Sequence, residues 1–107
     1  PATAWQGLHE VDECILLLNP PNGWIQNCNS TPFTAAGEYS PKPENYPYYM
    51  SIAPENFRGV HARMLLPEVQ DLTLDGLIAL AYDPYLPAFE QVIPGLINAY
   101  DNYAGNY

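Results

Sequence analysis

Basic residues are scarce in this sequence of 107 residues, and their scarcity limits what the protein can bind. Three Lys and Arg stand against 12 Asp and Glu, which gives a formal net charge of −9. Nucleic acids and anionic membranes are held by clustered Lys and Arg side chains. We therefore expect no nucleic-acid partner and no membrane partner.

Long apolar runs and a leader segment are also lacking. No stretch approaches the roughly 18 consecutive apolar residues of a membrane-spanning helix. Residues 1–10 have no basic start followed by an apolar stretch, so no signal peptide is recognised there. The sequence starts at Pro1 without an initiator Met, and we expect the chain to be cut from a longer protein.

What is abundant points to a folded domain with irregular connections. Apolar residues make up 48% of the chain, which argues against intrinsic disorder, and the length fits one domain. The 12 Pro and 9 Tyr indicate long connections that are ordered but irregular. The two Cys are too few to identify the redox compartment.

Residues 13–29 carry the pattern of a β-hairpin. The apolar run at 13–19 has the length of a strand, and a looser alternation follows the turn-forming sequence Pro-Pro-Asn-Gly. In a register centred near Pro21, Cys14 faces Cys28 at a separation that a disulfide accepts. A pair of buried free thiols is the alternative, because a slip of one residue changes the register.

Residues 30–53 show neither a helical nor a strand period, and we predict a long Pro/Tyr-rich loop there. Loops of this length inside a compact domain are usually functional or packed against something else. The cluster of Tyr46, Tyr48 and Tyr49 fits packing or, alternatively, a platform for a ligand.

Three helices are predicted across residues 54–105 from apolar residues spaced by three and four. The first has Pro54 and Glu55 in its opening turn and ends at Pro67. In the second, Thr73 is the expected N-cap.

The third helix is predicted to open with Pro87 and to close at Gly105, with Pro94 kinking it or splitting it in two. Together with the hairpin, these helices give an α+β fold class. Since two strands alone do not make a stable sheet, we expect the hairpin to join a larger sheet outside this chain.

No nucleophile–base pair and no zinc spacing stands out. The serines sit in no elbow motif, and His61 falls inside a helix, where we expect a satisfied or solvent-facing side chain. A thiol dyad of His61 with Cys14 or Cys28 is the alternative. The acidic cluster at 10–13 fits a solvated edge or, alternatively, a calcium site.

The amides of Asn27 and Asn29 remain as candidates for chemistry. An Asn N–H donor aimed at a developing oxyanion contributes roughly 3–4 kcal/mol in acyl transfer. Asn also commonly caps the backbone of its own turn, and the residues alone favour that interpretation.

The stretch 19–33 strongly resembles the penicillin acylase family, N-terminal-nucleophile amidohydrolases that include penicillin, aculeacin and acyl-homoserine-lactone acylases. The resemblance is carried by Asn19-Pro20, Gly23-Trp24-Ile25, Asn27-Cys28-Asn29 and Pro32. It continues into "ENFRGVHARMLL" and "LTLDGLIALAYD", so that it covers most of the chain beyond about Glu13.

The resemblance implies a hydrolase that cleaves a linear amide. In this family the second Asn of the triplet donates its side chain to the oxyanion hole, which maps to Asn29. A helical Arg supports the polar network of the active site, which maps to Arg58, with Arg63 as a structural partner. The family's nucleophile is a free N-terminal Ser, which Pro1 cannot replace. We therefore expect a nucleophile outside this chain and a fragment that is inactive alone.

The resemblance further implies an interior segment of the β-chain of an αββα sandwich. Its partners would be the rest of the β-chain, the α-chain and a small-molecule amide, in the periplasm or outside the cell. No cofactor is expected, and residues 45–57 lack the Asp through which some members bind calcium. The isolated fragment would expose apolar surface and could self-associate. The alternative is a small non-catalytic module that binds sugar or peptide through the loop at 39–49.

Overall fold

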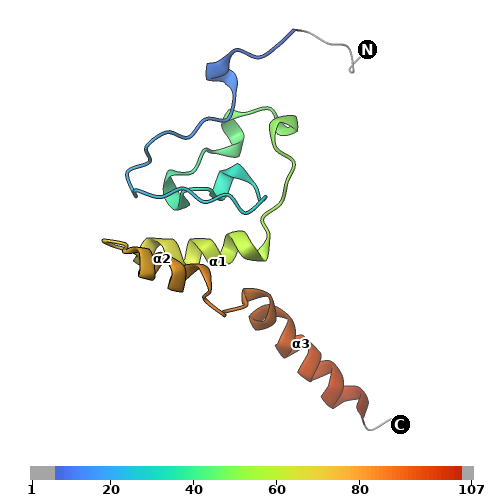
Figure 1. Ribbon diagram of the computed structural model, residues 1–107. Helices are drawn as coiled ribbons and strands as arrows, with labels where there is room; N and C mark the ends of the chain where they lie inside the picture. The colour runs from blue at the N-terminus through green and yellow to red at the C-terminus, as the bar shows by residue number, and fades with distance from the viewer. Residues whose placement is uncertain (1–6, 105–107) are drawn as a thin grey trace, which may run out of the picture.

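The computed structural model describes residues 7–104, and the regular structure in that range is helical (Figure 1). Three α-helices lie in the C-terminal half: α1 (Phe57–Leu65), α2 (Leu74–Ala81) and α3 (Pro87–Tyr103). Short 3-10 turns occupy Val11–Glu13, Pro32–Thr34, Gly37–Tyr39, Pro43–Asn45, Tyr48–Met50 and Leu66–Glu68. No strand occurs between residues 7 and 104, so the predicted α+β class and its β-hairpin are wrong.

The segment predicted as a hairpin, residues 13–29, forms the turn but not the paired strands. Gly23 N donates to Pro20 O at 2.9 Å, and Gly23 has a positive φ of 76°. Just before this turn, Asn19 takes a left-handed φ of 46°. A left-handed residue breaks an extended path, so the arm before the turn does not run back along the arm that follows it.

The arm after the turn bonds to the segment that comes next in the sequence. Gln26 N donates to Ala35 O at 2.8 Å, and its side-chain Nε2 donates to Thr34 O at 3.3 Å. Asn22 Nδ2 donates to Ala36 O at 2.9 Å. Because these donors already have acceptors in residues 34–36, local turn structure replaces the ladder that the alternation predicts.

Loss of the hairpin also removes the predicted opposition of the two cysteines. Both are free thiols: Cys14 is exposed and Cys28 is half-buried. Neither a disulfide nor a pair of buried thiols describes them.

A small polar-and-alanine core organises residues 22–40. Ala35 and Ala36 are buried, and Ser40 Oγ accepts from Ala36 N at 2.9 Å and donates to Gly37 O at 2.7 Å. The Trp24 ring lies against Gly37. Since the buried apolar side chains of residues 22–40 are both alanines, this core is shallow.

Side-chain caps fix where the first two α-helices begin. Asn56 Oδ1 accepts from Gly59 N at 3.0 Å, so α1 starts at Phe57, three residues later than the sequence suggests. Thr73 Oγ1 accepts from Gly76 N at 3.1 Å, which confirms Thr73 as the N-cap of α2.

The third helix begins at Pro87 as predicted. It runs through Pro94 to Tyr103 without interruption, so of the two alternatives predicted at Pro94, a kink or a split, the split is wrong. Its predicted end at Gly105 lies outside the described residues.

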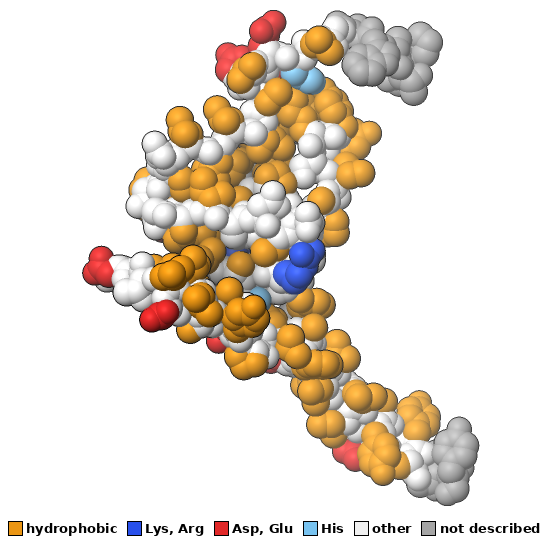
Figure 2. Space-filling model, viewed as in Figure 1, with side chains coloured by type: hydrophobic (Ala, Val, Ile, Leu, Met, Phe, Trp, Pro, Cys, Tyr) orange, Lys and Arg blue, Asp and Glu red, His pale blue; other side chains and the backbone are white. Residues whose placement is uncertain are grey.

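The chain is extended, and its apolar helix faces are open. The Cα radius of gyration is 19.5 Å, whereas a compact domain of this length has about 13 Å. The α3 helix projects away from the rest (Figure 1), and apolar side chains cover its visible face (Figure 2). The apolar face of α3 is exposed, for example Leu96 at 64%. Within residues 7–104, no helix combines the length and apolar character that crossing a membrane requires.

Candidate functional site

The candidate site begins with a tight turn around Asn29. Asn27 Oδ1 accepts a hydrogen bond from Asn29 N at 3.0 Å, and Asn29 has a left-handed φ of 54°. A positive φ is uncommon for non-glycine residues, and Asn is among those most often found there. The two amides of the triplet therefore differ: that of Asn27 holds the turn, while that of Asn29 extends from it.

Arg58, on the first turn of α1, contacts this second amide. Its Nη2 donates to Asn29 Oδ1 at 3.2 Å. Since a guanidinium has only donors, the amide oxygen must face Arg58, and Nδ2 must face the other way. Within residues 7–104, Nδ2 of Asn29 donates to no protein acceptor. The structure thus brings together the two site residues predicted from the family resemblance, with one amide donor unused.

Asn56 connects the same turn to the start of α1. Its Oδ1 caps the helix, while its Nδ2 donates to Cys28 O at 2.8 Å and lies 3.4 Å from Asn29 O. Gly59 is buried where α1 meets Ser30. The side chains of Asn56 and Ser30 therefore lie between the turn and the start of α1.

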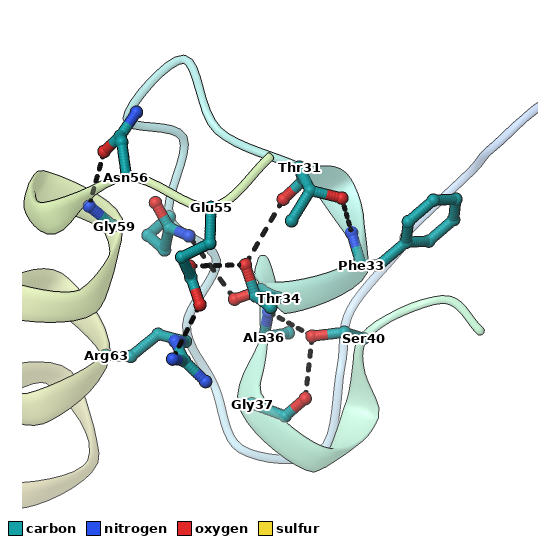
Figure 3. A network of polar contacts seen from close by, with 11 residues as sticks. Thr31, Phe33, Thr34, Ala36, Gly37, Ser40, Glu55, Asn56, Gly59 and Arg63 are labelled. Atoms are coloured by element: carbon teal, nitrogen blue, oxygen red, sulfur yellow. Dashed lines mark hydrogen bonds and ion pairs between the residues drawn. The ribbon is translucent and has the colours of Figure 1, made fainter. Parts of the chain in front are cut away.

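A second polar network joins α1 to residues 31–40 (Figure 3). Glu55 accepts from Thr34 Oγ1 at 2.8 Å through Oε1 and pairs with Arg63 Nη2 at 2.7 Å through Oε2. Thr31 Oγ1 accepts from Phe33 N at 3.3 Å. Arg63 thus forms its ion pair with Glu55, and among the described residues it makes no hydrogen bond with Asn29.

The sequence matches a known protein family over nearly its whole length. The sequence model of the penicillin amidase family matches residues 1–106. The chain belongs to the penicillin amidase family. No solved structure matches it.

Among the Lys and Arg side chains of this penicillin amidase segment within residues 7–104, only Arg63 pairs with a carboxylate. Arg63 is paired with Glu55, and Lys42 Nζ donates to Glu38 O at 3.1 Å. Between residues 7 and 104, Arg58 forms no ion pair. Its positive charge therefore attracts a negatively charged group that comes near Asn29.

His61 is satisfied away from the turn. Its Nε2 lies 2.8 Å from Asp83 Oδ1, and the same oxygen accepts from Tyr85 N at 3.0 Å. The backbone N–H of Tyr85, followed by the His61 side chain, holds the pKa of Asp83 below its ordinary value. The imidazole thus has a carboxylate partner rather than the thiol of the alternative dyad.

The described region gathers neither a set of metal ligands nor a serine–histidine pair. No group of three His, Cys, Asp or Glu side chains within residues 7–104 is placed to hold a metal ion, the acidic cluster at 10–13 included. In the same range no serine hydroxyl bonds to a histidine.

The sequence patterns missed Asn56 and Gly59. An Asn directly before the first apolar residue of a helix, here Phe57, is a recognisable N-cap pattern. That pattern gives the role of Oδ1, but nothing local shows that Nδ2 reaches a turn 27 residues earlier in the chain.

Proposed function

We propose that this segment supplies the oxyanion donor to an amidohydrolase (acylase) that cleaves a linear amide. In this proposal Asn29 Nδ2 is the donor, and Arg58 holds the Asn29 amide in the orientation that leaves Nδ2 free. The substrate is a small-molecule amide, and neither its acyl chain nor its amine is fixed by these residues.

The proposed reaction proceeds through an acyl-enzyme. The Oγ of an N-terminal Ser attacks the amide carbonyl carbon, and the Ser α-amine accepts the hydroxyl proton. Negative charge develops on the carbonyl oxygen, where Asn29 Nδ2 donates a hydrogen bond. The C–N bond breaks as the α-ammonium returns the proton to the departing amine. Water then attacks the ester and releases the acid.

The hydrogen bond from Arg58 to Asn29 Oδ1, at 3.2 Å, is the single observation that carries the proposal. An oxyanion donor must be oriented before the charge develops, because reorienting it during the reaction costs free energy. Arg58 supplies that orientation, and within residues 7–104 it forms no ion pair that would draw it away from Asn29. An amide that only capped its turn would need neither feature.

The nucleophile is proposed to come from outside this chain. Within residues 7–104 the Ser40 hydroxyl bonds to backbone, and Thr34 bonds to Glu55. Neither has a basic nitrogen as partner. The proposed Ser belongs to the same acylase and requires the processed, intact protein, so the segment alone is expected to be inactive.

The remaining β-chain and the α-chain are the proposed partners. The apolar face of α3 is open, with Leu96 and Tyr100 at 64% and 70% exposure. Apolar patches of this kind in monomers usually mark contact surfaces. The family resemblance also supports a periplasmic or secreted location, which fractionation of expressing cells would test.

The first test replaces Asn29 by Ala in the intact, processed enzyme. With phenylacetyl- and octanoyl-p-nitroanilide as probe substrates, we expect kcat to fall by about two to three orders of magnitude. Asn98→Ala is the matched control, because Asn98 lies in α3 and its Oδ1 accepts only from Asn102 Nδ2 at 3.0 Å within the described region. Unchanged kcat in a folded Asn29→Ala enzyme refutes the assignment.

A second candidate function is a small non-catalytic module that binds sugar or peptide. Tyr48 is 85% exposed and lies edge-on to Tyr49, with ring centroids 6.0 Å apart. Exposed aromatic rings suit apolar sugar faces and peptide side chains. A glycan and peptide array probed with this chain, with Tyr48→Ser as the control, tests this candidate. A signal that Tyr48→Ser removes supports it, and its absence excludes it.

A further inference from the structure

Asn56 does more than cap its helix. We infer that it is a positioning residue for catalysis, which holds the Cys28–Asn29 turn against the first turn of α1 and so places the Asn29 amide. The inference rests on the proposed function of Asn29, and the experiment below separates the two.

The two ends of the Asn56 side chain serve two different segments. Oδ1 accepts from Gly59 N at 3.0 Å, while Nδ2 donates to Cys28 O at 2.8 Å and approaches Asn29 O at 3.4 Å. The donor is thus directed at the peptide that leads into Asn29 and at the carbonyl that follows it. One amide plane fixes both the helix start and the backbone on either side of the Asn29 Cα.

The turn backbone that Asn56 contacts has an uncommon conformation. Asn29 has a φ of 54°, a conformation that non-glycine residues rarely occupy, and its other contact within the turn is the bond from its N–H to Asn27 Oδ1 at 3.0 Å. Arg58 then contacts the side chain from α1. Because Asn56 and Arg58 lie on either side of Phe57, the same helix start positions both the backbone and the amide of Asn29.

Close packing between Gly59 and Ser30 supports this reading independently. A Cβ added at Gly59 would lie 2.8 Å from Ser30 Oγ and 3.3 Å from Ser30 Cβ. The residue after Asn29 therefore lies directly against the helix backbone, and the distance between turn and helix is set on two sides.

The cap of α2 shows that a helix start in this chain does not require an amide. Thr73 Oγ1 accepts from Gly76 N at 3.1 Å, the same bond that Asn56 Oδ1 makes with Gly59 N. A hydroxyl thus satisfies the capping role at the equivalent position. The Nδ2 group of Asn56 is additional, and its partners are the backbone of the proposed oxyanion site.

The test uses variants that keep the cap and remove the donor. Ser and Asp are both good N-caps, so Asn56→Ser and Asn56→Asp retain an acceptor for Gly59 N but have no N–H for the turn. Thr73→Ala is the matched control, because it removes a cap without touching the site. All are made in the intact, processed enzyme and compared with Asn29→Ala, with kcat, KM and thermal midpoint measured for each on the p-nitroanilide probes.

We expect kcat to fall about 10- to 100-fold in Asn56→Ser and Asn56→Asp, the loss associated with misplacement of a catalytic group by up to 1 Å, with KM within twofold. Thr73→Ala lowers the thermal midpoint and leaves kcat unchanged. Wild-type kcat in both Asn56 variants, or an equal loss in Thr73→Ala, overturns the inference while Asn29→Ala remains impaired. If Asn29→Ala itself keeps full kcat, the proposed function fails first, and the inference fails with it.

Discussion

Adding a single methyl group to Gly59 should move the proposed oxyanion site. Gly59 lies in the first turn of α1, where its missing side chain allows the helix to approach Ser30. In Gly59→Ala, the new Cβ would lie 2.8 Å from Ser30 Oγ and 3.1 Å from Glu55 Oε1. Ordinary van der Waals contact begins at about 3.4 Å, so Ser30 Oγ must move by about 0.6 Å.

Two opposing effects decide the stability change. Replacing Gly by Ala inside a helix gains about 1 kcal/mol of helix propensity, while overpacking costs about 1–3 kcal/mol. The net loss is therefore between about zero and 2 kcal/mol, too small to be diagnostic. Activity is the sharper measurement, because a displacement of about 1 Å at a catalytic group costs up to about 100-fold in rate. A shift of about 0.6 Å at Ser30, which follows Asn29 directly, should therefore lower kcat about tenfold.

The assay is hydrolysis of p-nitroanilides by the intact, processed enzyme, followed at 25 °C by release of p-nitroaniline. Gly95→Ala in α3 is the matched control, because a Cβ there meets nothing within 4 Å and should leave kcat unchanged. Ser30→Ala supplies the rescue. Ser30 Oγ is buried without a hydrogen-bond partner within the described residues, so its removal costs no bond and frees the space that the new methyl group requires.

The double variant Gly59→Ala/Ser30→Ala should recover most of the kcat that Gly59→Ala loses. A folded Gly59→Ala enzyme with wild-type kcat refutes the reasoning, since it would mean that the turn moves without consequence. The same loss in the double variant also refutes it, because the contact with Ser30 would then not be the cause.

Three further outcomes are expected. Arg58→Lys keeps the charge but loses the planar fork, and should lower kcat about tenfold, equivalent to about 1.4 kcal/mol; an unchanged kcat contradicts the orienting role. The pKa of Asp83 is depressed from 3.8 by the N–H of Tyr85 and by His61, so its stabilisation is present above pH 3.8 and is lost as pH falls through the lower folded pKa. Asp83→Asn should therefore lower the thermal midpoint at pH 7 and match the wild type in strong acid, and a difference that does not depend on pH contradicts this. The isolated 107-residue chain should self-associate on size exclusion with light scattering, and a compact monomer would contradict the need for covering chains.

Local sequence signals predicted where α2 and α3 begin, because each of these starts depends on neighbouring residues. Thr73 caps α2 through a bond to the N–H three residues on, and Pro87 opens α3 where a missing N–H costs nothing. The hairpin prediction is wrong because Gln26 N has its acceptor at Ala35, outside the predicted hairpin, and an alternation of apolar residues cannot reveal that bond.

The candidate site was also predictable only in part from local sequence patterns. Asn29 and Arg58 were identified by family resemblance, whereas the residues alone favoured a turn cap for both amides of the triplet. The turn cap is correct for Asn27, whose Oδ1 accepts from Asn29 N. That Arg58 lies on the Asn29 amide depends on how α1 meets a turn 29 residues earlier, and no local pattern contains that distance.

The most direct test of the central claim is Asn29→Asp in the intact, processed enzyme. This change keeps the shape and the acceptor for Arg58 Nη2 but replaces the Nδ2 donor with an oxygen. If Nδ2 stabilises the oxyanion, kcat on the p-nitroanilides falls by at least about two orders of magnitude while the thermal midpoint is retained. If the Asn29 side chain serves only to bind Arg58, Asn29→Asp retains wild-type kcat, and the account is contradicted.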